Sequence, residues 1–271
     1  MFIRTKKKQA CFLPKSFEPR GINELVRLGS DHDGGYVVSA DAVASTRHLL
    51  TLGLGDNCDF EYDFAAMARL NSLTCYDASV SAETLRSRNA LVRLVSLFRP
   101  ERHRRFIAFY KQYRSLFGSA RPGFSHIRED VGTTEGMTSL AEAVERLSPG
   151  PGKLFLKVDV AGREYDFLDQ IIEANEFLAG LVIVFYSADA RLREIEVFVG
   201  AMREFMSIDN TAADNTAGLS GIGIPRVIEL SFSAKFPAEP HIPSAGASTR
   251  YKALTAPNDP NLIEYELFYV E

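Results

Sequence analysis

A glycine pair and an acid interrupt the apolar stretch HLLTLGLGD, just before a segment with helical spacing. In open α/β sheets, small ligands bind beyond the carboxyl ends of the strands. Gly53 and Gly55 would allow a tight turn and a close approach of the backbone to such a ligand. Asp77 ends the next apolar run, and an acid about twenty residues after such glycines accepts hydrogen bonds from ribose hydroxyls. These residues predict a nucleoside-binding turn, although a turn without a ligand would show the same glycines.

The residue types around the turn favour one class of nucleoside. The dinucleotide pattern G-x-G-x-x-G/A is broken, because Cys58 stands at its last position. Asp56, Asp59 and Glu61 crowd the start of the following helix, where a pyrophosphate would need a positive field. Two like charges ~4 Å apart repel by roughly 4 kcal/mol at an effective dielectric constant of about 20. A sulfonium and an ammonium group are attracted by the same acids, so we predict S-adenosyl-L-methionine as the cofactor.

Longer stretches of the chain are also distinctive, namely RLGSDHDGGYVV, LLTLGLGDNCDFEYDFA, CYDAS, TSLAEAVERL with LFLKVDVAGREYDFL, and the tail IPRVIELSFSAKF with NDPNLIEYELFYV. In this order they resemble the FkbM-type methyltransferases, which depend on S-adenosyl-L-methionine. The resemblance implies a cofactor site made by Gly53, Gly55, Asp56 and Asp77. It also implies a flap or wall over the cofactor, formed by Asp33, Gly34, Gly35 and Tyr36.

Several positions depart from the family pattern on the side where a methyl acceptor is expected. Ala161 replaces the family's usual Glu, and Val184 and Tyr186 stand at the places of a Glu and a His. The stretch SIDNTAADN lacks an expected histidine. The first hypothesis is an O-methyltransferase acting on a hydroxyl of a sugar, a glycan or a related secondary metabolite. The alternative is a catalytically degenerate binding or assembly module in glycan biosynthesis, and a nicotinamide-dependent oxidoreductase comes third.

Asp159 is the first candidate for a catalytic group, because it follows the apolar run KLFLKV and would point into the crevice of the sheet. A base that removes a proton from an acceptor hydroxyl accelerates transfer by roughly 10²–10⁴-fold. We expect Asp159 to be that base or to orient the acceptor, with Lys157 facing the opposite way. A cap for the next helix is the alternative role of Asp159.

Tyr186 is the second catalytic candidate and is expected to line the acceptor pocket. Asp189, Asp209 and Asn210 would line the same pocket, although an ordinary loop residue is the more frequent role for residues of this kind. Asp159, Asp189 and Asp209 offer the oxygen ligands that Mg²⁺ or Ca²⁺ prefer. No spacing requires a divalent metal, so no metal site is predicted.

Apolar runs alternate with helical patterns along most of the chain, which indicates βαβ units. Strands are expected at 48–54, 72–77, 124–130, 153–160 and 181–187, and helices at 22–28, 59–70, 81–97, 101–117, 138–147, 163–179 and 190–205. The end of the chain reads as two further strands around a long loop. The prediction is an α/β fold with a Rossmann-like, doubly wound, mostly parallel sheet of the class I methyltransferase type, antiparallel C-terminal edge strands and a helical insertion. Residues 1–20 are expected to form an arm, and residues 21–271 a single domain.

The helical insertion, at about 93–121, is strongly basic. From Arg93 to Arg121 it carries eight Arg and Lys residues against the single acid Glu101, interleaved with aromatic residues. This pattern suggests contact with an anionic glycan, a lipid-linked intermediate or a membrane surface. A helical hairpin with solvated arginines is the simpler alternative.

Composition limits the other functions. The formal net charge of −4 and the pI near 5.8 disfavour a general nucleic-acid binder, so we expect a small-molecule or glycan acceptor and no nucleic acid. Three cysteines without a CxxC pattern indicate neither a disulfide framework nor a zinc site. No apolar run is long enough to cross a bilayer, and the first residues lack the features of a signal peptide. A cytoplasmic location is therefore expected, whereas the oligomeric state stays open.

Overall fold

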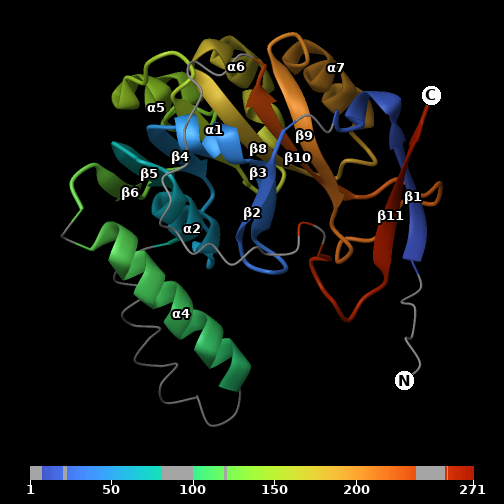
Figure 1. The fold of residues 1–271 in the computed structure, drawn as a ribbon, viewed down its shortest axis with the longest axis horizontal. Coiled ribbons are helices and arrows are strands. Elements are labelled where there is room, and N and C mark those ends of the chain that lie inside the picture. Colours follow the sequence, from blue (N-terminus) through green and yellow to red (C-terminus); the bar gives the residue numbers. More distant parts are fainter. Residues whose placement is uncertain (1–7, 21–22, 81–99, 119–120, 236–253, 255) are drawn as a thin grey trace.

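The computed structural model describes residues 8–20, 23–80, 100–118, 121–235, 254 and 256–271, with side chains from Arg104 onward in the helix that starts at Pro100. Its centre is a seven-stranded sheet (Figure 1). The strands of this sheet are β4 (His48–Leu52), β5 (Ser72–Tyr76), β6 (Phe124–Ile127), β7 (Leu154–Val158), β8 (Leu178–Tyr186), β9 (Met206–Ala213) and β10 (Val227–Ala234). The strands β4, β7 and β8 are buried along almost their whole length, so they read as mostly apolar runs in the sequence.

The strand order is β6-β5-β4-β7-β8-β10-β9. The first five strands are parallel, and they extend outward from the neighbouring pair β4 and β7, where the chain order reverses. The strand β10 is antiparallel to both β8 and β9. This arrangement confirms the predicted α/β, doubly wound, mostly parallel sheet. In such a sheet the ligand crevice lies at the carboxyl ends of the strands beside the reversal point.

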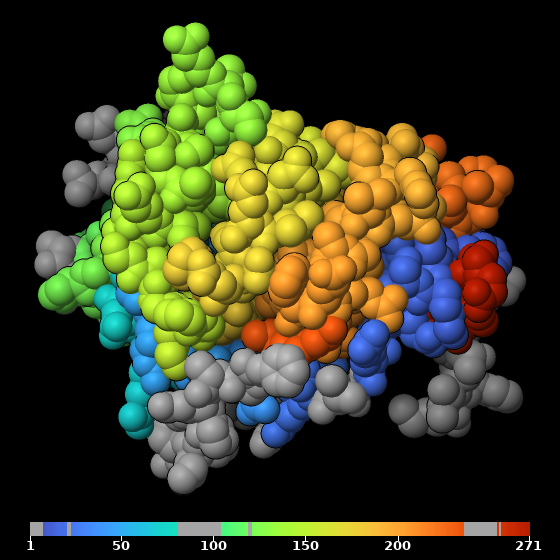
Figure 2. Space-filling view, turned by 90° about the horizontal axis from the view of Figure 1, so that it is seen from above, coloured from blue at the N-terminus to red at the C-terminus, as the bar shows by residue number. Residues whose placement is uncertain are grey.

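Helices cover the sheet on both faces. The helices are α1 (Ala40–Ser45), α2 (Asp59–Met67), α4 (Pro100–Phe117), α5 (Leu140–Leu147), α6 (Leu168–Glu173) and α7 (Leu192–Met202). Figure 2 shows α5, α6 and α7 side by side on one face. The long helix expected at 163–179 is interrupted, because the 3₁₀ turns η2 (Glu164–Phe167) and η3 (Asn175–Phe177) flank a short α6.

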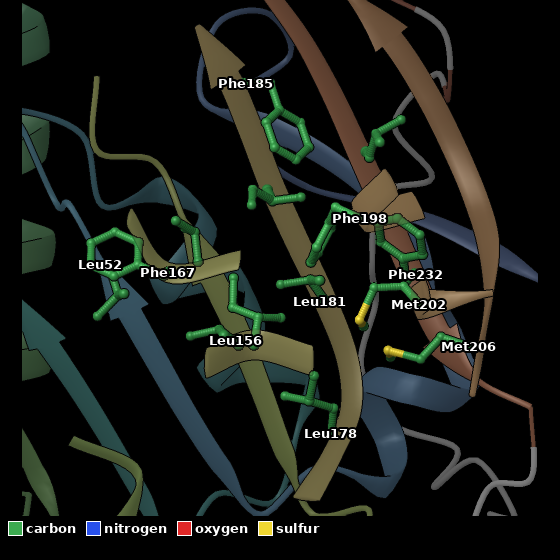
Figure 3. Close-up of a cluster of buried hydrophobic side chains, with 14 of the residues drawn as sticks. Leu52, Leu156, Phe167, Leu178, Leu181, Phe185, Phe198, Met202, Met206 and Phe232 are labelled. Atoms are coloured by element: carbon green, nitrogen blue, oxygen red, sulfur yellow. The ribbon is translucent and has the colours of Figure 1, made fainter. Parts of the chain in front are cut away.

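The larger hydrophobic cluster lies between the sheet and these helices (Figure 3). Phe185 and Leu181 of β8 pack there with Phe198 and Met202 of α7, and all four are at most 1% exposed. The ring centroids of Phe185 and Phe198 are 5.9 Å apart. Full burial of such a side chain stabilises the fold by about 1.5–3 kcal/mol. The central strands are therefore firmly held, which fixes the positions of the residues at their carboxyl ends.

The helix predicted at 22–28 is wrong, because a hairpin occupies this part of the chain. β2 (Leu25–Gly29) and β3 (Gly35–Ser39) pair in antiparallel fashion, and the hairpin packs against α2 and β10. So short an apolar stretch is a marginal helix in water, and tertiary packing decides its structure. The segment DGGYVV therefore belongs to the turn and the second strand of this hairpin.

The first described residues are not the arm expected at 1–20. β1 (Lys8–Pro14) pairs in parallel with β11 (Glu264–Val270) in a separate two-stranded sheet (Figure 1). Phe17, in the 3₁₀ turn η1 (Lys15–Phe17), is fully buried in the main core. The antiparallel edge of the central sheet is consequently made by β9 and β10, without β11. The proposed domain limits themselves stay a prediction.

The helix α4 lies within the insertion predicted at about 93–121. Figure 1 shows it standing out from the body of the molecule beside β6. Residues 81–99 and 119–120, including the helix predicted at 81–97, lie outside the described residues. Within the described ranges, none of the helices has the length and apolar character needed to span a membrane.

Candidate functional site

The glycine turn follows β4 at the reversal point of the sheet. Gly53 has φ +84°, and a Cβ atom there would lie 1.9 Å from the backbone oxygen of Asp159. Only glycine therefore fits, because both the left-handed conformation and the close approach exclude a side chain. Gly55 also has a positive φ of +60°, but nothing lies within 4 Å of its Cβ position. The turn thus packs tightly on β7 at Gly53 and leaves space beside Gly55.

Asp77, at the end of β5, holds this turn in place. One carboxylate oxygen accepts hydrogen bonds from the amides of Leu54 and Gly55, at 2.9 and 2.7 Å. The other accepts from the amide and the hydroxyl of Ser79, at 2.7 and 2.5 Å. Burial would raise the pKa of Asp77, but the hydrogen bonds from Ser79, Gly55 and Leu54 outweigh it and hold the pKa below its usual value. The four bonds occupy the acceptor sites of the carboxylate, so the predicted bonds to a ribose would have to share them.

The hairpin segment Asp33–Tyr36 lies against the glycine turn, as a wall would. A Cβ atom on Gly34 would lie 2.2 Å from the side-chain nitrogen of Asn57, and one on Gly35 would lie 1.9 Å from the backbone oxygen of Ser30. The Asn57 side chain donates a hydrogen bond of 3.4 Å to the backbone oxygen of Asp33. The two glycines are therefore needed for the hairpin turn to close against the start of α2.

Asp159 lies between two tyrosine hydroxyls. Its two carboxylate oxygens accept hydrogen bonds of 2.9 Å from Tyr36 of the hairpin and from Tyr186 at the end of β8. Burial, together with the charge of Asp159, raises the pKa of both tyrosines, so both stay protonated donors. The structure thus brings together the two predicted catalytic residues, Asp159 and Tyr186, with the predicted wall residue Tyr36.

Lys157 shares a face of β7 with Asp159, so the expectation that it faces the opposite way is wrong. Residues two apart on a strand lie on the same side of a sheet. The Lys157 ammonium lies 5.3 Å from the Tyr36 ring centroid and 3.2 Å from a carboxylate oxygen of Glu61. Burial lowers the pKa of Lys157, but the charges of Glu61 and Asp159 outweigh this effect and raise it. Glu61 is consequently neutralised by Lys157 and does not face a ligand.

The negative field at the site comes from a set of acids that the fold assembles. Burial is the main cause that raises the pKa of Asp33, and the charges of Asp214, Asp159 and Asp56 raise it further. The predicted cofactor residue Asp56 is exposed at the turn. These carboxylates come from the hairpin, the glycine turn, β7 and the segment after β9, and together they disfavour an anion at the turn.

Two residues with strained backbones follow the strands β7 and β8 at the site. Ala161 has φ +51° and Ser187 has φ +53°, which costs a residue other than glycine about 1–2 kcal/mol. Glu164, which is fully buried, ties the two turns together: its carboxylate accepts from the amides of Gly162 at 2.8 Å and of Tyr186 at 2.7 Å. Such strain persists where the surroundings enforce it, frequently at functional sites.

Glu229 of β10 is a site residue that the sequence prediction missed. Burial raises its pKa to about 7, with further contributions from the charges of Asp159 and Asp214. It lines a cavity of about 270 Å³ together with Arg27, Gly35 and Asn258, whose amide donates to the Glu229 carboxylate at 3.3 Å. The sequence signal was a lone acid inside the apolar strand VIELSF.

The structure does not bring the other predicted pocket residues together in one place. Asn210 lines the cavity at Glu229, which Tyr186 does not line. Asp189 instead forms an ion pair of 3.7 Å with Arg226. The Asp209 side chain is buried and accepts hydrogen bonds from Asn23 and Ser233, at 2.7 and 2.8 Å. Over the part of the chain that the structure describes, no group of three acids, histidines or cysteines is arranged to hold a metal ion.

Comparison with known proteins gives a likeness in structure only. The sequence matches no protein-family model and no curated protein. Similar structures include the 23S rRNA methyltransferase ErmE, with 13% identity, a TM-score of 0.38, and 74% of this chain and 68% of that chain covered. Precorrin-6y C5,15-methyltransferase from Geobacter metallireducens has 10% identity and a TM-score of 0.35, over 72% and 86% of the two chains. TYW2 of M. jannaschii, in complex with AdoMet, has 9% identity and a TM-score of 0.32, over 78% and 88%.

These comparisons correct one prediction. The prediction that excluded nucleic acid as a partner does not stand, since the similar structures include an rRNA methyltransferase and a net charge of −4 does not by itself exclude such a partner. TYW2, one of these structures, holds AdoMet, which is the cofactor predicted from this sequence. The narrower resemblance to FkbM-type methyltransferases is not supported by any of them and stays a prediction.

Proposed function

We propose that this protein is an S-adenosyl-L-methionine-dependent O-methyltransferase whose acceptor is a hydroxyl of a sugar, a glycan or a related metabolite. The observation that carries the proposal is the carboxylate of Asp159, which is held by the hydroxyls of Tyr36 and Tyr186 while its backbone contacts the glycine turn at Gly53.

The turn fits a cationic nucleoside. Gly55 leaves its surroundings open, and Asp33, Asp56 and Asp159 surround the turn with negative charge. When bound, S-adenosyl-L-methionine would supply a methyl group on a positively charged sulfur. A pyrophosphate at the same place would meet these acids without a compensating cation, because Lys157 is already paired with Glu61.

Asp159 and its tyrosines supply the acid–base chemistry of the proposal. A hydroxyl acceptor must lose a proton as its oxygen gains the methyl group. Asp159 takes this proton, directly or through the Tyr186 hydroxyl, while Tyr36 keeps the carboxylate oriented. Glu229, with a pKa of about 7, is a second carboxylate able to take up a proton near neutral pH.

The cavity at Glu229 is the candidate site for the acceptor. Its walls combine the carboxylate of Glu229 and the guanidinium of Arg27 with the amides of Asn210, Asn215 and Asn258. Such donors and acceptors match the hydroxyl groups of a sugar, whereas an apolar ligand would leave them unpaired.

A binding module without catalysis is the second candidate function. Both oxygens of Asp159 already accept hydrogen bonds, and Ala161 stands where the resemblance predicts a glutamate. A protein of this kind would bind the nucleoside and show no transfer.

Calorimetry with S-adenosyl-L-methionine, S-adenosylhomocysteine and NAD tests the cofactor, and transfer of labelled methyl groups to a panel of sugars tests the reaction. We expect binding of both S-adenosyl compounds, and a loss of transfer in Asp159→Asn without loss of cofactor binding. Glu194→Gln, an exposed position on α7, is the matched control. Binding of NAD alone would overturn the cofactor, and cofactor binding without any transfer would favour the binding module.

A further inference from the structure

The most basic stretch of the chain begins in α4 and continues past β6. Residues 102–128 contain seven Arg and Lys residues and no acid, in a protein whose formal net charge is −4. The exposed cations with described side chains are Arg104, Arg105, Lys111, Arg114, Arg121 and Arg128. Over the residues that the structure describes, none of these six forms an ion pair. Their charge is therefore available to a partner.

Three of these cations form a stripe on one side of the helix. Arg104, Lys111 and Arg114 are spaced seven and three residues apart, which places them on the same face. At 1.5 Å per residue the stripe is about 15 Å long. A stripe of this length spans several phosphates of an extended nucleic-acid strand.

Aromatic rings border the stripe. The rings of Phe106 and Tyr110 are nearly parallel, at 11° with centroids 6.4 Å apart, and both are half-buried. The guanidinium of Arg114 lies 5.9 Å from the Tyr110 ring centroid, and that of Arg121 lies 5.3 Å from the Phe124 ring centroid. Rings and guanidinium planes next to a positive groove are the features on which bases of single strands stack.

The apolar side of α4 is already occupied. Phe109, Tyr113 and Leu116 are at most 8% exposed and pack in the second core cluster. A helix that lies in a membrane interface needs its apolar face for the lipid chains. The apolar face of α4 is buried against the rest of the protein. Its exposed side therefore offers charged groups and ring edges, which suit a polyanion with bases better than a bilayer.

The helix α4 is anchored near the glycine turn through its buried side. The Cys58 thiol, at the start of α2, contacts the backbone oxygen of Phe109 at 3.9 Å. Tyr113 is hydrogen-bonded to His126 at 2.7 Å, and His126 to the backbone oxygen of Asp77 at 3.0 Å. The cavity at Glu229 lies at the opposite edge of the sheet, along β9 and β10. The surface is therefore distinct from the acceptor cavity of the proposed function.

We propose that the exposed face of α4, with Arg104, Lys111, Arg114 and the Phe106–Tyr110 pair, binds single-stranded nucleic acid. The contact is independent of methyl transfer and needs no cofactor. Phosphates lie along the stripe, and bases stack against Tyr110 and the Arg114 plane.

Fluorescence anisotropy with the whole protein and a labelled oligouridylate of about 20 nucleotides tests this proposal. The triple variant Arg104→Ala/Lys111→Ala/Arg114→Ala is expected to lower the slope of log K against log salt by about 2, since each phosphate contact on a single strand contributes about 0.7. Its Kd at 0.1 M salt is expected to rise more than tenfold. A control with the same charge change, Lys15→Ala/Arg193→Ala/Arg226→Ala, is expected to keep most of the affinity.

A second variant separates stacking from charge. Tyr110→Leu is expected to weaken binding several-fold while the salt slope stays unchanged, and circular dichroism melts verify that α4 is intact. Equal losses in the triple variant and its control would overturn the proposal. So would binding of anionic phosphatidylglycerol vesicles but not of the oligouridylate, equal binding of heparin with no effect of Tyr110→Leu, or no binding of the oligouridylate at all.

Discussion

Replacing Lys157 by methionine removes the buried cation that lies beneath the candidate site. Lys157 and Glu61 have side-chain exposures of 5% and 0%, and their charged atoms are 3.2 Å apart. The remaining bond to that Glu61 oxygen comes from the Thr51 hydroxyl at 3.0 Å, while the other oxygen has no partner among the described residues. Lys157→Met would thus leave a buried carboxylate with one neutral donor. Breaking such a pair typically costs about 3–5 kcal/mol.

Thermal unfolding measures this cost. For a chain of this size, 1 kcal/mol lowers Tm by about 2 °C or more, so Lys157→Met is expected to lose at least about 6 °C. The double variant Glu61→Gln/Lys157→Met removes both charges and keeps the Thr51 bond, so it is expected to recover much of this loss. Lys15→Met, which breaks the exposed pair with Glu18, is the control and is expected to leave Tm unchanged.

The pH dependence of stability gives a second measure of what the Lys157–Glu61 pair contributes. The pKa of Lys157 is raised in the folded protein. Its contribution to the free energy of unfolding is therefore complete below its unfolded pKa of about 10.5, and it is lost as the pH rises through the higher folded pKa. The native protein should therefore lose more stability above pH ~10.5 than Lys157→Met does. A Tm for Lys157→Met within 2 °C of the native value, or a double variant no better than the single one, would refute the reasoning.

Three further predictions concern the site. In the native protein the free energy of unfolding is expected to fall by roughly 3 kcal/mol between pH 4.5 and about 7, because the raised pKa of Glu229 lets the folded state keep a proton that the unfolded state has lost. Glu229→Gln is expected to abolish this fall, which urea unfolding at both ends of the pH range measures. Asp77→Asn is expected to cost about 1.5–3 kcal/mol at pH 7 and progressively less in acid, because the pKa of Asp77 is lowered in the folded protein and its contribution is lost as the pH falls through that lowered value; an equal loss of stability at pH 7 and in acid would contradict the role of Asp77 in holding the glycine turn. Gly53→Ala is expected to abolish S-adenosyl-L-methionine binding in calorimetry, because its Cβ would lie 1.9 Å from the Asp159 backbone, whereas the open position of Gly55 should tolerate alanine better.

The central fold was predictable because burial leaves a direct mark on the sequence. β4, β7 and β8 lie inside the molecule, so each is a mostly apolar run that can be recognised without knowing its partner strands. The hairpin of β2 and β3 left no such mark: five-residue strands have too few positions to show a period, and their packing on α2 and β10 decides the structure. The pairing of β1 with β11 joins residues more than 250 positions apart, and no local pattern indicates such a contact.

The candidate site shows the same division between what is local and what the fold assembles. Gly53, Gly55 and Asp77 were found because an apolar run ends at each of them. The contacts between site residues, such as the hydrogen bonds of Tyr36 and Tyr186 to Asp159, were not predicted, since the partner of a carboxylate is set by the tertiary structure.

The preference of the turn for a cation rests on groups that only the folded chain brings together. Two acids near the turn already have partners: Glu61 is paired with Lys157, and the Asp77 oxygens are bonded to backbone amides and Ser79. The remaining charges, of Asp33, Asp56 and Asp159, come from three separate segments. Asp33 reaches the turn through the hairpin, which closes there because Gly34 fits beside Asn57. A side chain at Gly34 should therefore weaken binding of a cationic nucleoside while the central sheet stays folded, although this glycine belongs to neither the turn nor any strand of that sheet.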